Sequence, residues 1–238
     1  MPFPKLLLTL NLRHGGGARV EAIGDWLVRR APDIAVLTEY RDNAAGGRLG
    51  ERLAAAGYAL ASASAGPGAN GVLIASRFRI DESASVTPER TSSGELLMAR
   101  IGGLAVLGCY FPGGKAKAPF FERCLALARA ETGAMVMIGD FNTGCNLRDL
   151  APGAARFDCA DQFLDLERAA GLTDLWRATH GPDAREWTWF SRVANGYRLD
   201  HAFGNAAFMA GTGSEAHYLH DCRETGLSDH SALMVVRG

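Results

Sequence analysis

The sequence contains no apolar run long enough to cross a membrane. Its apolar runs, such as Leu6–Leu8 and Ala134–Ile138, are far shorter than the roughly 20 residues that a membrane-spanning helix needs. The apolar part of the N-terminus is too short for a secretory signal, because Asn11 and Arg13 interrupt it. We therefore expect neither a membrane protein nor a membrane partner.

The sequence also lacks the cysteine spacing of a disulfide framework or a zinc knuckle. Its five cysteines are odd in number and scattered, and none stand in C-x-x-C spacing. This pattern predicts reduced thiols and a cytoplasmic protein. No 20–50-residue repeat and no long linker divides the 238 residues, so we expect a single domain over residues 1–238.

A long basic run is missing as well, and the net charge is −1. Nothing in the charge therefore indicates a tight, purely electrostatic nucleic-acid binder. The charge is uneven, because residues 121–238 hold 16 Asp and Glu against 11 Lys and Arg. If several of these carboxylates converge on one site, they need a metal cation to offset their repulsion.

What the sequence does contain is an alternation of strand-like and helical segments, the latter marked by apolar residues at helical spacing. The expected strands are Leu6–Asn11, Ile34–Thr38, Gly71–Ser76, Leu96–Ile101, Leu104–Tyr110, Met135–Gly139 and Ser231–Val236. The expected helices are Ala18–Arg30, Ala44–Ala56, Ala118–Glu131 and Asp161–Ala170. Residues 61–70 are rich in Gly, Ala and Ser and predict a loop. The mixture indicates α/β sheets with helices on their outer faces.

Polar residues of catalytic type stand where several of these segments end or begin. They are Asn11, Glu39, Tyr110, Asp140, Asn142, Asp200, Asp229 and His230. Because ligand sites in α/β folds gather at the carboxyl ends of strands, we expect these side chains to share one site. The set is rich in oxygen, which suits Mg²⁺ or Mn²⁺ and not structural zinc. A metal, an Asp that activates water and a His that offsets phosphate charge are the groups of metal-assisted phosphodiester hydrolysis.

Each of these residues, taken alone, has a simpler structural explanation. Glu39 could form a cap or a salt bridge at a strand end, and Asp140 could form an Asx-type turn. Asp200 could pair with Arg198 on the surface, for ~1 kcal/mol or less. Asp229 could cap a helix or strand. None of these explanations accounts for the placement of all these residues at strand ends in one chain.

Eight short motifs carry a more specific signal through their order along the chain. They are Leu10-Asn11, Pro32–Glu39, Asn70–Arg77, Tyr110-Phe111-Pro112, Gly139–Asn142, Trp187–Phe190, Tyr197–Asp200 and Ser228-Asp229-His230. This order resembles the endonuclease/exonuclease/phosphatase superfamily, and within it the exonuclease III-like abasic-site endonucleases. The resemblance extends from Leu10 to Val235.

The resemblance implies a four-layer α/β sandwich of the DNase I-like type. Two mixed β-sheets would pack face to face, with helices outside them. Glu39 would be the principal ligand of the metal, Mg²⁺ or Mn²⁺, and Asn11 and Asp229 would lie near it.

The resemblance also implies catalytic roles. Asp140 would orient or deprotonate the attacking water, and Asn142 would hold the phosphate. His230, oriented by Asp200, would stabilise the pentacovalent phosphate. Tyr110 would contact the phosphate or the leaving oxygen.

The branch of the superfamily is indicated by Tyr110-Phe111-Pro112, which is similar to the abasic-site enzymes. In that branch an apolar pocket accepts a flipped abasic sugar, and Trp189, Tyr197 and Leu199 match its positions. The alternative is that Trp187 and Trp189 are alternate residues of a strand, one of them in the core.

The chain departs from the family's pattern after its first strand. Arg13 replaces an Asp or Asn, Arg41 replaces a Lys, and Gly15–Gly17 could form a turn or let the backbone approach a phosphate. The loop cations expected to bind substrate phosphates are Arg13, Arg41, Arg77, Lys115 and Lys117.

The function predicted from all of this is a Mg²⁺-dependent phosphodiester hydrolase acting on DNA. It would work as an abasic-site endonuclease, a 3′–5′ exonuclease or a 3′-end-processing enzyme, as a monomer without an obligatory protein partner. One alternative is a metal-dependent phosphoesterase on a small-molecule or lipid phosphoester, which the near-neutral charge favours mildly. A binding module without catalysis is disfavoured, because the full set of catalytic residues is present.

Overall fold

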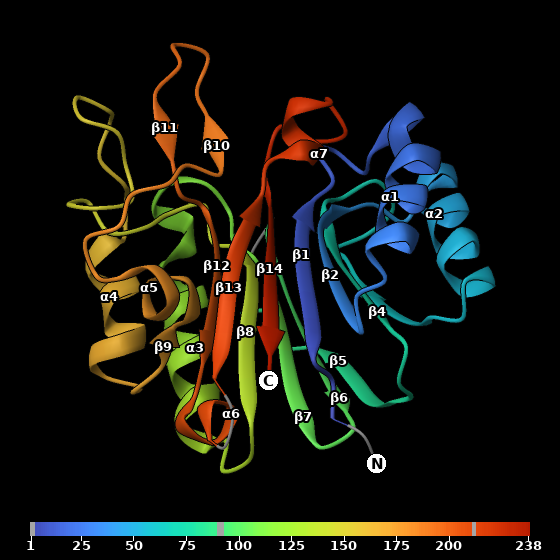
Figure 1. Ribbon diagram of the computed structural model, residues 1–238, viewed down its shortest axis with the longest axis horizontal. Helices are drawn as coiled ribbons and strands as arrows, with labels where there is room; N and C mark the ends of the chain where they lie inside the picture. Colours follow the sequence, from blue (N-terminus) through green and yellow to red (C-terminus); the bar gives the residue numbers. More distant parts are fainter. Residues whose placement is uncertain (1–2, 90–92, 211–212) are drawn as a thin grey trace.

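The computed structural model describes residues 3–89, 93–210 and 213–238. Within these ranges two six-stranded sheets pack face to face, and helices cover the outer face of each (Figure 1). Each sheet contains one parallel pair and otherwise antiparallel pairs, so both are mixed. The predicted four-layer α/β sandwich is therefore confirmed.

The strands follow the order β13-β14-β1-β2-β4-β3 in the first sheet and β5-β6-β7-β8-β12-β9 in the second. The first sheet consists of β1 (Leu6–Asn11), β2 (Ile34–Tyr40), β3 (Ala59–Ala63), β4 (Gly71–Ser76), β13 (Ser214–Leu219) and β14 (Ala232–Arg237). The second consists of β5 (Ile80–Ser85), β6 (Glu95–Ile101), β7 (Leu104–Tyr110), β8 (Met135–Asp140), β9 (Thr173–Asp174) and β12 (Asp200–Gly204). A separate hairpin pairs β10 (Trp189–Phe190) with β11 (Gly196–Tyr197).

The helices divide between the two outer faces and the ends of the sandwich. They are α1 (Val20–Arg30), α2 (Ala44–Ala55), α3 (Ala118–Ala130), α4 (Ala160–Arg168), α5 (Leu175–His180), α6 (Ala206–Met209) and α7 (Asp221–Glu224), with 3₁₀ turns η1 (Gly17–Arg19) and η2 (Gly114–Lys117). In Figure 1, α1 and α2 lie on one side and α3 and α4 on the other. In the described ranges, none of the helices combines the length and the apolar character that a membrane crossing requires.

The period of two along each strand decides which side chains meet between the sheets. In β8, Val136 and Ile138 lie in the core between the sheets, whereas Met135 and Met137 pack toward α3. By the same alternation Asp140, the last residue of β8, belongs to the inner face. The inner face of the sandwich is therefore apolar along most of its length and turns polar at one end.

Two details differ from the elements expected from the sequence. Residues 59–63 form the edge strand β3, although 61–70 were expected to be a loop. β3 is built only from Ala, Leu and Ser, and none of its residues is fully buried, so its sequence has no strong strand pattern. In addition, Asp200 begins β12, a strand that was not among those expected, whereas His230 precedes β14 as the sequence predicted. β12 and β14 run antiparallel to β8 and β1, so their first residues lie at the same end of the sandwich.

A cluster of buried ion pairs holds the segment that immediately precedes β12. Arg198 is fully buried, and its guanidinium donates to Asp149 Oδ1 at 2.6 Å and also to Asp174, while Arg177 pairs with Asp149 from the other side. The expected surface pair between Arg198 and Asp200 is therefore wrong, because Arg198 is buried and its carboxylate partners lie elsewhere. Burial alone would raise the pKa of Asp149, but Arg198 and then His201 and Arg177 outweigh it and hold the pKa at about 2.

This cluster predicts a loss of stability in acid. The folded-state pKa of Asp149 lies below its ordinary value of 3.8, so the stabilisation is present above about pH 4 and is lost as the pH falls toward 2. The shift corresponds to about 2 kcal/mol. In urea unfolding, the Asp149→Asn variant should be less stable than wild type at pH 7 and should lose less of its unfolding free energy between pH 4 and pH 2. Equal losses in the two proteins would contradict this assignment.

Candidate active site

The predicted site residues come together at one end of the sandwich, between the two sheets. Asn11 is the last residue of β1, Glu39 is the penultimate residue of β2, and Asp140 is the last residue of β8. Asp200 starts β12 beside Asp140, and His230 precedes β14. Side chains that are far apart in the sequence thus reach one polar region from both sheets.

Glu39 reaches this region through a β-bulge. The register of β2 on β4 shifts between Thr38 and Tyr40, and Glu39 has a φ of 55°. Leu37 and Tyr40 both pack toward α1 and α2, although they are three residues apart. The alternation of side chains is therefore interrupted at the bulge, where Glu39 lies. In a regular strand Glu39 would share the face of Leu37 and would point into the outer core. The bulge instead aims its carboxylate at Asn11.

Asp140 is held by its neighbours on both sides. Gly139 has a φ of 151°, and a Cβ atom there would lie 2.0 Å from the carbonyl oxygen of Cys109, so only glycine fits before the carboxylate. The N–H of Asn142 donates to Asp140 Oδ1 at 2.9 Å, which is the Asx-type turn considered above. The turn and the shared site are therefore compatible, since the turn orients the carboxylate.

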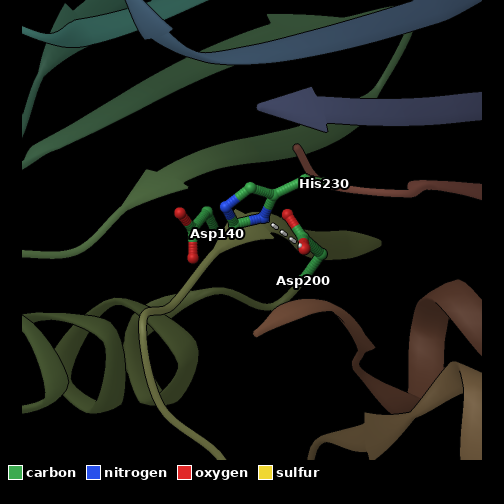
Figure 2. Close-up of side chains that lie close together, drawn as sticks. All are labelled: Asp140, Asp200 and His230. Carbon is green, nitrogen blue, oxygen red and sulfur yellow. Dashed lines mark hydrogen bonds and ion pairs between the residues drawn. The ribbon is translucent and has the colours of Figure 1, made fainter. Parts of the chain in front are cut away.

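The imidazole of His230 lies between the carboxylates of Asp140 and Asp200 (Figure 2). Its Nδ1 is 2.8 Å from Asp200 Oδ2, and all three side chains are buried. Each offers a ligand atom within 4.8 Å of the others, so this cluster of titratable groups could also hold a metal ion.

Charge in this cluster is shifted strongly by burial and by the close carboxylates. Burial alone would lower the pKa of His230, but Asp200, followed by Asp140 and Asp229, raises it to about 10. Burial raises the pKa of Asp140 to about 7; His230 opposes this shift and Asp200 reinforces it. The ring is therefore an imidazolium at neutral pH, and it faces a carboxyl whose pKa burial has raised toward neutrality.

Asn11 connects Asp140 to Glu39. Its amide Nδ2 donates to Asp140 Oδ2 at 2.9 Å and to Glu39 Oε1 at 3.2 Å. Asp229 lies on the other side of the region, where Trp189 Nε1 donates to its Oδ2 at 3.3 Å and Arg13 Nε lies 4.0 Å away. Carboxylate and amide oxygens of this kind suit a hard divalent cation, so the donor set fits the metal that the sequence predicts.

A second wall of the site joins Tyr110 to Arg41 through Asn70. Arg41 Nε donates to Asn70 Oδ1 at 2.6 Å, and Asn70 Nδ2 donates to the hydroxyl oxygen of Tyr110 at 3.1 Å. Burial, followed by the charge of Glu39, raises the pKa of Tyr110 well above its ordinary value. The hydroxyl therefore keeps its proton and can donate it to an anionic oxygen.

The three aromatic and apolar residues expected to form a pocket lie beside this region. The hairpin of β10 and β11 projects beyond the end of the sheets (Figure 1). Within it the rings of Trp189 and Tyr197 are 5.8 Å apart, and the Trp189 ring is 6.4 Å from that of His230. Leu199 is buried next to Asp200. The alternative that Trp187 or Trp189 is a core residue is wrong, because both are partly exposed and Thr188 between them is buried.

The structure corrects two of the expected phosphate-binding cations. Arg77 follows β4 at the opposite end of the first sheet, where Ser76 pairs with Ile34, and its guanidinium lies over the ring of Tyr58. Lys117 is buried and its Nζ donates to the carbonyl oxygen of Asn142. Neither is an exposed cation of the site. Arg13, with 53% of its side chain exposed, remains available to a substrate.

Sequence reasoning missed two residues that contact the site. The backbone N–H of His14 donates to Glu39 Oε2 at 2.6 Å, and its Nδ1 lies 3.3 Å from the guanidinium of Arg41. Asn70 joins Arg41 to Tyr110. Asn70 stood in one of the motifs but received no role, and His14 carried no signal other than its position before Gly15–Gly17.

Comparison with known proteins shows which family the chain resembles over most of its length. The family model described as Endonuclease/Exonuclease/phosphatase family matches residues 8–230. The comparison with curated protein sequences found no match.

Three solved structures share the fold over nearly the full chain. The 3′ phosphatase NExo from Neisseria, bound to a product DNA hairpin, is 22% identical, with a TM-score of 0.82. The 3′–5′ exonuclease NExo from Neisseria meningitidis is 21% identical (TM-score 0.82), and an AP endonuclease from Archaeoglobus fulgidus is 21% identical (TM-score 0.81). Each alignment covers 98% of this chain and 99% of the other. With its family model matched over residues 8–230, the chain belongs to the Endonuclease/Exonuclease/phosphatase family of hydrolases.

Proposed function

We propose that this hydrolase cleaves phosphodiester bonds in DNA with the help of Mg²⁺ or Mn²⁺. Its activity would be that of an abasic-site endonuclease, a 3′–5′ exonuclease or a 3′-end-processing enzyme. The observation that carries the proposal is the buried carboxyl of Asp140, flanked by the His230 imidazolium on one side and by Asn11 and Glu39 on the other. The chain would act as a monomer and a single domain over residues 1–238.

Glu39, with Asn11 and Asp229, would hold the cation. When bound there, a divalent cation polarises a phosphate oxygen and eases departure of the leaving oxygen. The carboxylate of Glu39 is already aimed by the amide of Asn11 and the N–H of His14, so little rearrangement is needed to present it.

Asp140 would orient the attacking water and accept its proton. Its pKa of about 7 suits a general base at neutral pH, and burial keeps it away from bulk water. The two hydrogen bonds from Asn142 N and Asn11 Nδ2 fix the carboxyl plane, which would let Asp140 aim a water in line with the leaving oxygen.

His230 would place its positive charge against the phosphate as the charge on the oxygens grows. Asp200 fixes the ring and keeps it protonated. Tyr110 would donate its hydroxyl proton to the phosphate or the leaving oxygen. Asn142 would bind a phosphate oxygen in place of its 3.4 Å contact with Asp140, because its other amide hydrogen is held by Phe111 O at 2.8 Å.

DNA as the substrate is supported by the site's surroundings and by its relatives. Arg13 and Arg41 lie at the mouth of the site, and Trp189, Tyr197 and Leu199 offer an apolar surface for a sugar without a base. A structural neighbour was solved with a DNA hairpin. The five free thiols are in keeping with a reducing cytoplasm.

A second candidate is the same chemistry on a small-molecule or lipid phosphoester. The observation in its favour is charge: the chain carries a net −1, and Arg77 and Lys117 are withdrawn from the cations that could bind a DNA backbone.

Substitution of the central acid–base pair should abolish hydrolysis without unfolding the protein. We expect Asp140→Asn and His230→Ala each to lower kcat by about 10²–10⁴-fold, because each removes a group that acts on the proton or the charge of the reacting phosphate. The measurement is single-turnover cleavage, with circular dichroism as the check on folding. Asp183→Asn, at an exposed position away from these groups, serves as the matched control. Undiminished activity in both site variants would show that Asp140 and His230 do not carry out the hydrolysis, whereas a folded wild type that cleaves no phosphoester would favour a binding module.

Metal removal should have a matching effect. Treatment with EDTA should abolish hydrolysis, and added Mg²⁺ or Mn²⁺ should restore it. Glu39→Gln keeps the shape of the side chain but removes its charge, so the metal concentration for half-maximal activity should rise by at least about tenfold. A Glu39→Gln titration curve that overlies that of wild type would remove Glu39 from the cation site.

A substrate panel decides between the two candidates. We expect at least one of three results: cleavage of an abasic duplex, removal of 3′-terminal nucleotides from a duplex, or release of a 3′-terminal blocking group. The affinity for DNA should fall steeply with salt, and Arg41→Gln should reduce the slope of log K against log salt by about one. Efficient turnover of a small phosphoester, with none on any DNA, would instead select the second candidate.

A further inference from the structure

The loop after β1 leads into η1 through five consecutive residues with positive φ angles. Arg13, His14, Gly15, Gly16 and Gly17 have φ angles of 53°, 55°, 73°, 75° and 54°. Glycine adopts this conformation without cost, which explains the three consecutive glycines. Arg13 and His14 are not glycine, so their conformation persists only where surrounding contacts hold it.

Two consecutive peptide units of this turn hold Asn11 and Glu39, two of the three residues proposed to bind the cation. The N–H of Arg13 donates to Asn11 Oδ1 at 2.8 Å, and the N–H of His14 donates to Glu39 Oε2 at 2.6 Å. In a trans peptide the carbonyl points away from the N–H, so whatever fixes the carbonyl also fixes the direction of the N–H. The carbonyls of these two units belong to Leu12 and Arg13.

Both carbonyls are bound by one side chain, that of Arg19 at the end of η1. Its Nη2 donates to Leu12 O at 3.1 Å and to Arg13 O at 2.8 Å. Its Nη1 donates to Leu227 O, in the loop between α7 and β14. One guanidinium therefore connects the turn that hydrogen-bonds Asn11 and Glu39 to the loop that carries Asp229 and His230.

A second contact reinforces this connection on the far side. Leu227 precedes Ser228, whose hydroxyl donates to the carbonyl oxygen of Asn11 at 2.6 Å and accepts the N–H of His230 at 3.0 Å. The distance between the turn after β1 and the loop before β14 thus depends on Arg19 and on Ser228.

We propose that Arg19 is a positioning residue that sets the geometry of the cation site through backbone carbonyls without touching the cation or the substrate. The inference rests on the cation site assigned above to Glu39, Asn11 and Asp229. It gives the positive φ angles of Arg13 and His14 a purpose, because this turn presents the carbonyls of Leu12 and Arg13 to one guanidinium.

Electrostatics alone predicts the opposite effect for loss of Arg19, and that difference makes the proposal testable. Burial and Arg13 lower the pKa of Arg19. Asp229 and Glu39 oppose this shift, so the guanidinium lies within electrostatic range of both carboxylates. Removing a positive charge beside two carboxylates should strengthen cation binding. Removing a part that orients the ligands should weaken it.

The experiment is calorimetric titration of the folded protein with Mn²⁺, which does not depend on catalysis. The first variant is Arg19→Gln, which removes both the positive charge and the planar guanidinium. The second is Arg19→Lys, which keeps the charge but cannot bind three carbonyls in the same plane. We expect Mn²⁺ to bind about tenfold more weakly in both variants. Arg13→Gln is the matched control, because Arg13 is an exposed cation 4.0 Å from Asp229, and its loss should tighten Mn²⁺ binding slightly.

Wild-type or tighter Mn²⁺ binding in Arg19→Lys would overturn the proposal, and thermal unfolding shows which variants are folded. If Arg19→Gln fails to fold, the Mn²⁺ affinity of Arg19→Lys alone tests the proposal. Cleavage of the abasic duplex by wild type is measured in parallel. A wild type that binds Mn²⁺ but cleaves no phosphoester would refute the proposed function and leave the role of Arg19 to the titration. A wild type that binds no Mn²⁺ would overturn the cation site and this inference together.

Discussion

Alternation of side chains along the strands is the constraint on which the rest of the molecule depends. Every second residue of β1, β7 and β8 faces the opposing sheet, and most of these residues are apolar. At one end the same positions carry Asn11, Tyr110 and Asp140. The core that holds the sheets together is therefore continuous with the wall of the site. The catalytic groups thus take their positions from the best-packed part of the structure.

Placing charged groups at the end of a core has an electrostatic consequence. Desolvation favours neutral forms, so isolated carboxylates there would be protonated. In this structure the cost of burying the carboxylates is offset by neighbouring groups. His230 lies between Asp140 and Asp200, and Asn11 lies between Asp140 and Glu39. Burial raises the pKa of Asp140, and the neighbouring carboxylates raise the pKa of His230 despite its burial, so the two environments suit the base and the cation proposed for this site.

The strands and most site residues could be predicted from the sequence, because apolar runs that end in Asn, Glu or Asp report both burial and position. The details that aim the side chains could not. Nothing in the residues around Glu39 marks its bulge, and the contacts of Arg19 are made to backbone carbonyls, which are the same in every sequence. Likewise, Arg77 and Lys117 carry the positive charge that a phosphate-binding residue needs. Tertiary packing, however, places the Arg77 guanidinium over the ring of Tyr58 and the Lys117 ammonium against the carbonyl of Asn142.

The same distinction explains why the chemistry can be assigned more closely than the substrate. The groups proposed to act on the phosphate, Asp140 and His230, are buried, and several contacts fix the geometry of each. The groups at the mouth are exposed and loosely held: Arg13 is 4.0 Å from its nearest carboxylate, and Trp189 lies in a projecting hairpin (Figure 1). Weakly held surface side chains adapt to a ligand at little cost, so their positions specify what binds far less than the buried groups specify what reacts.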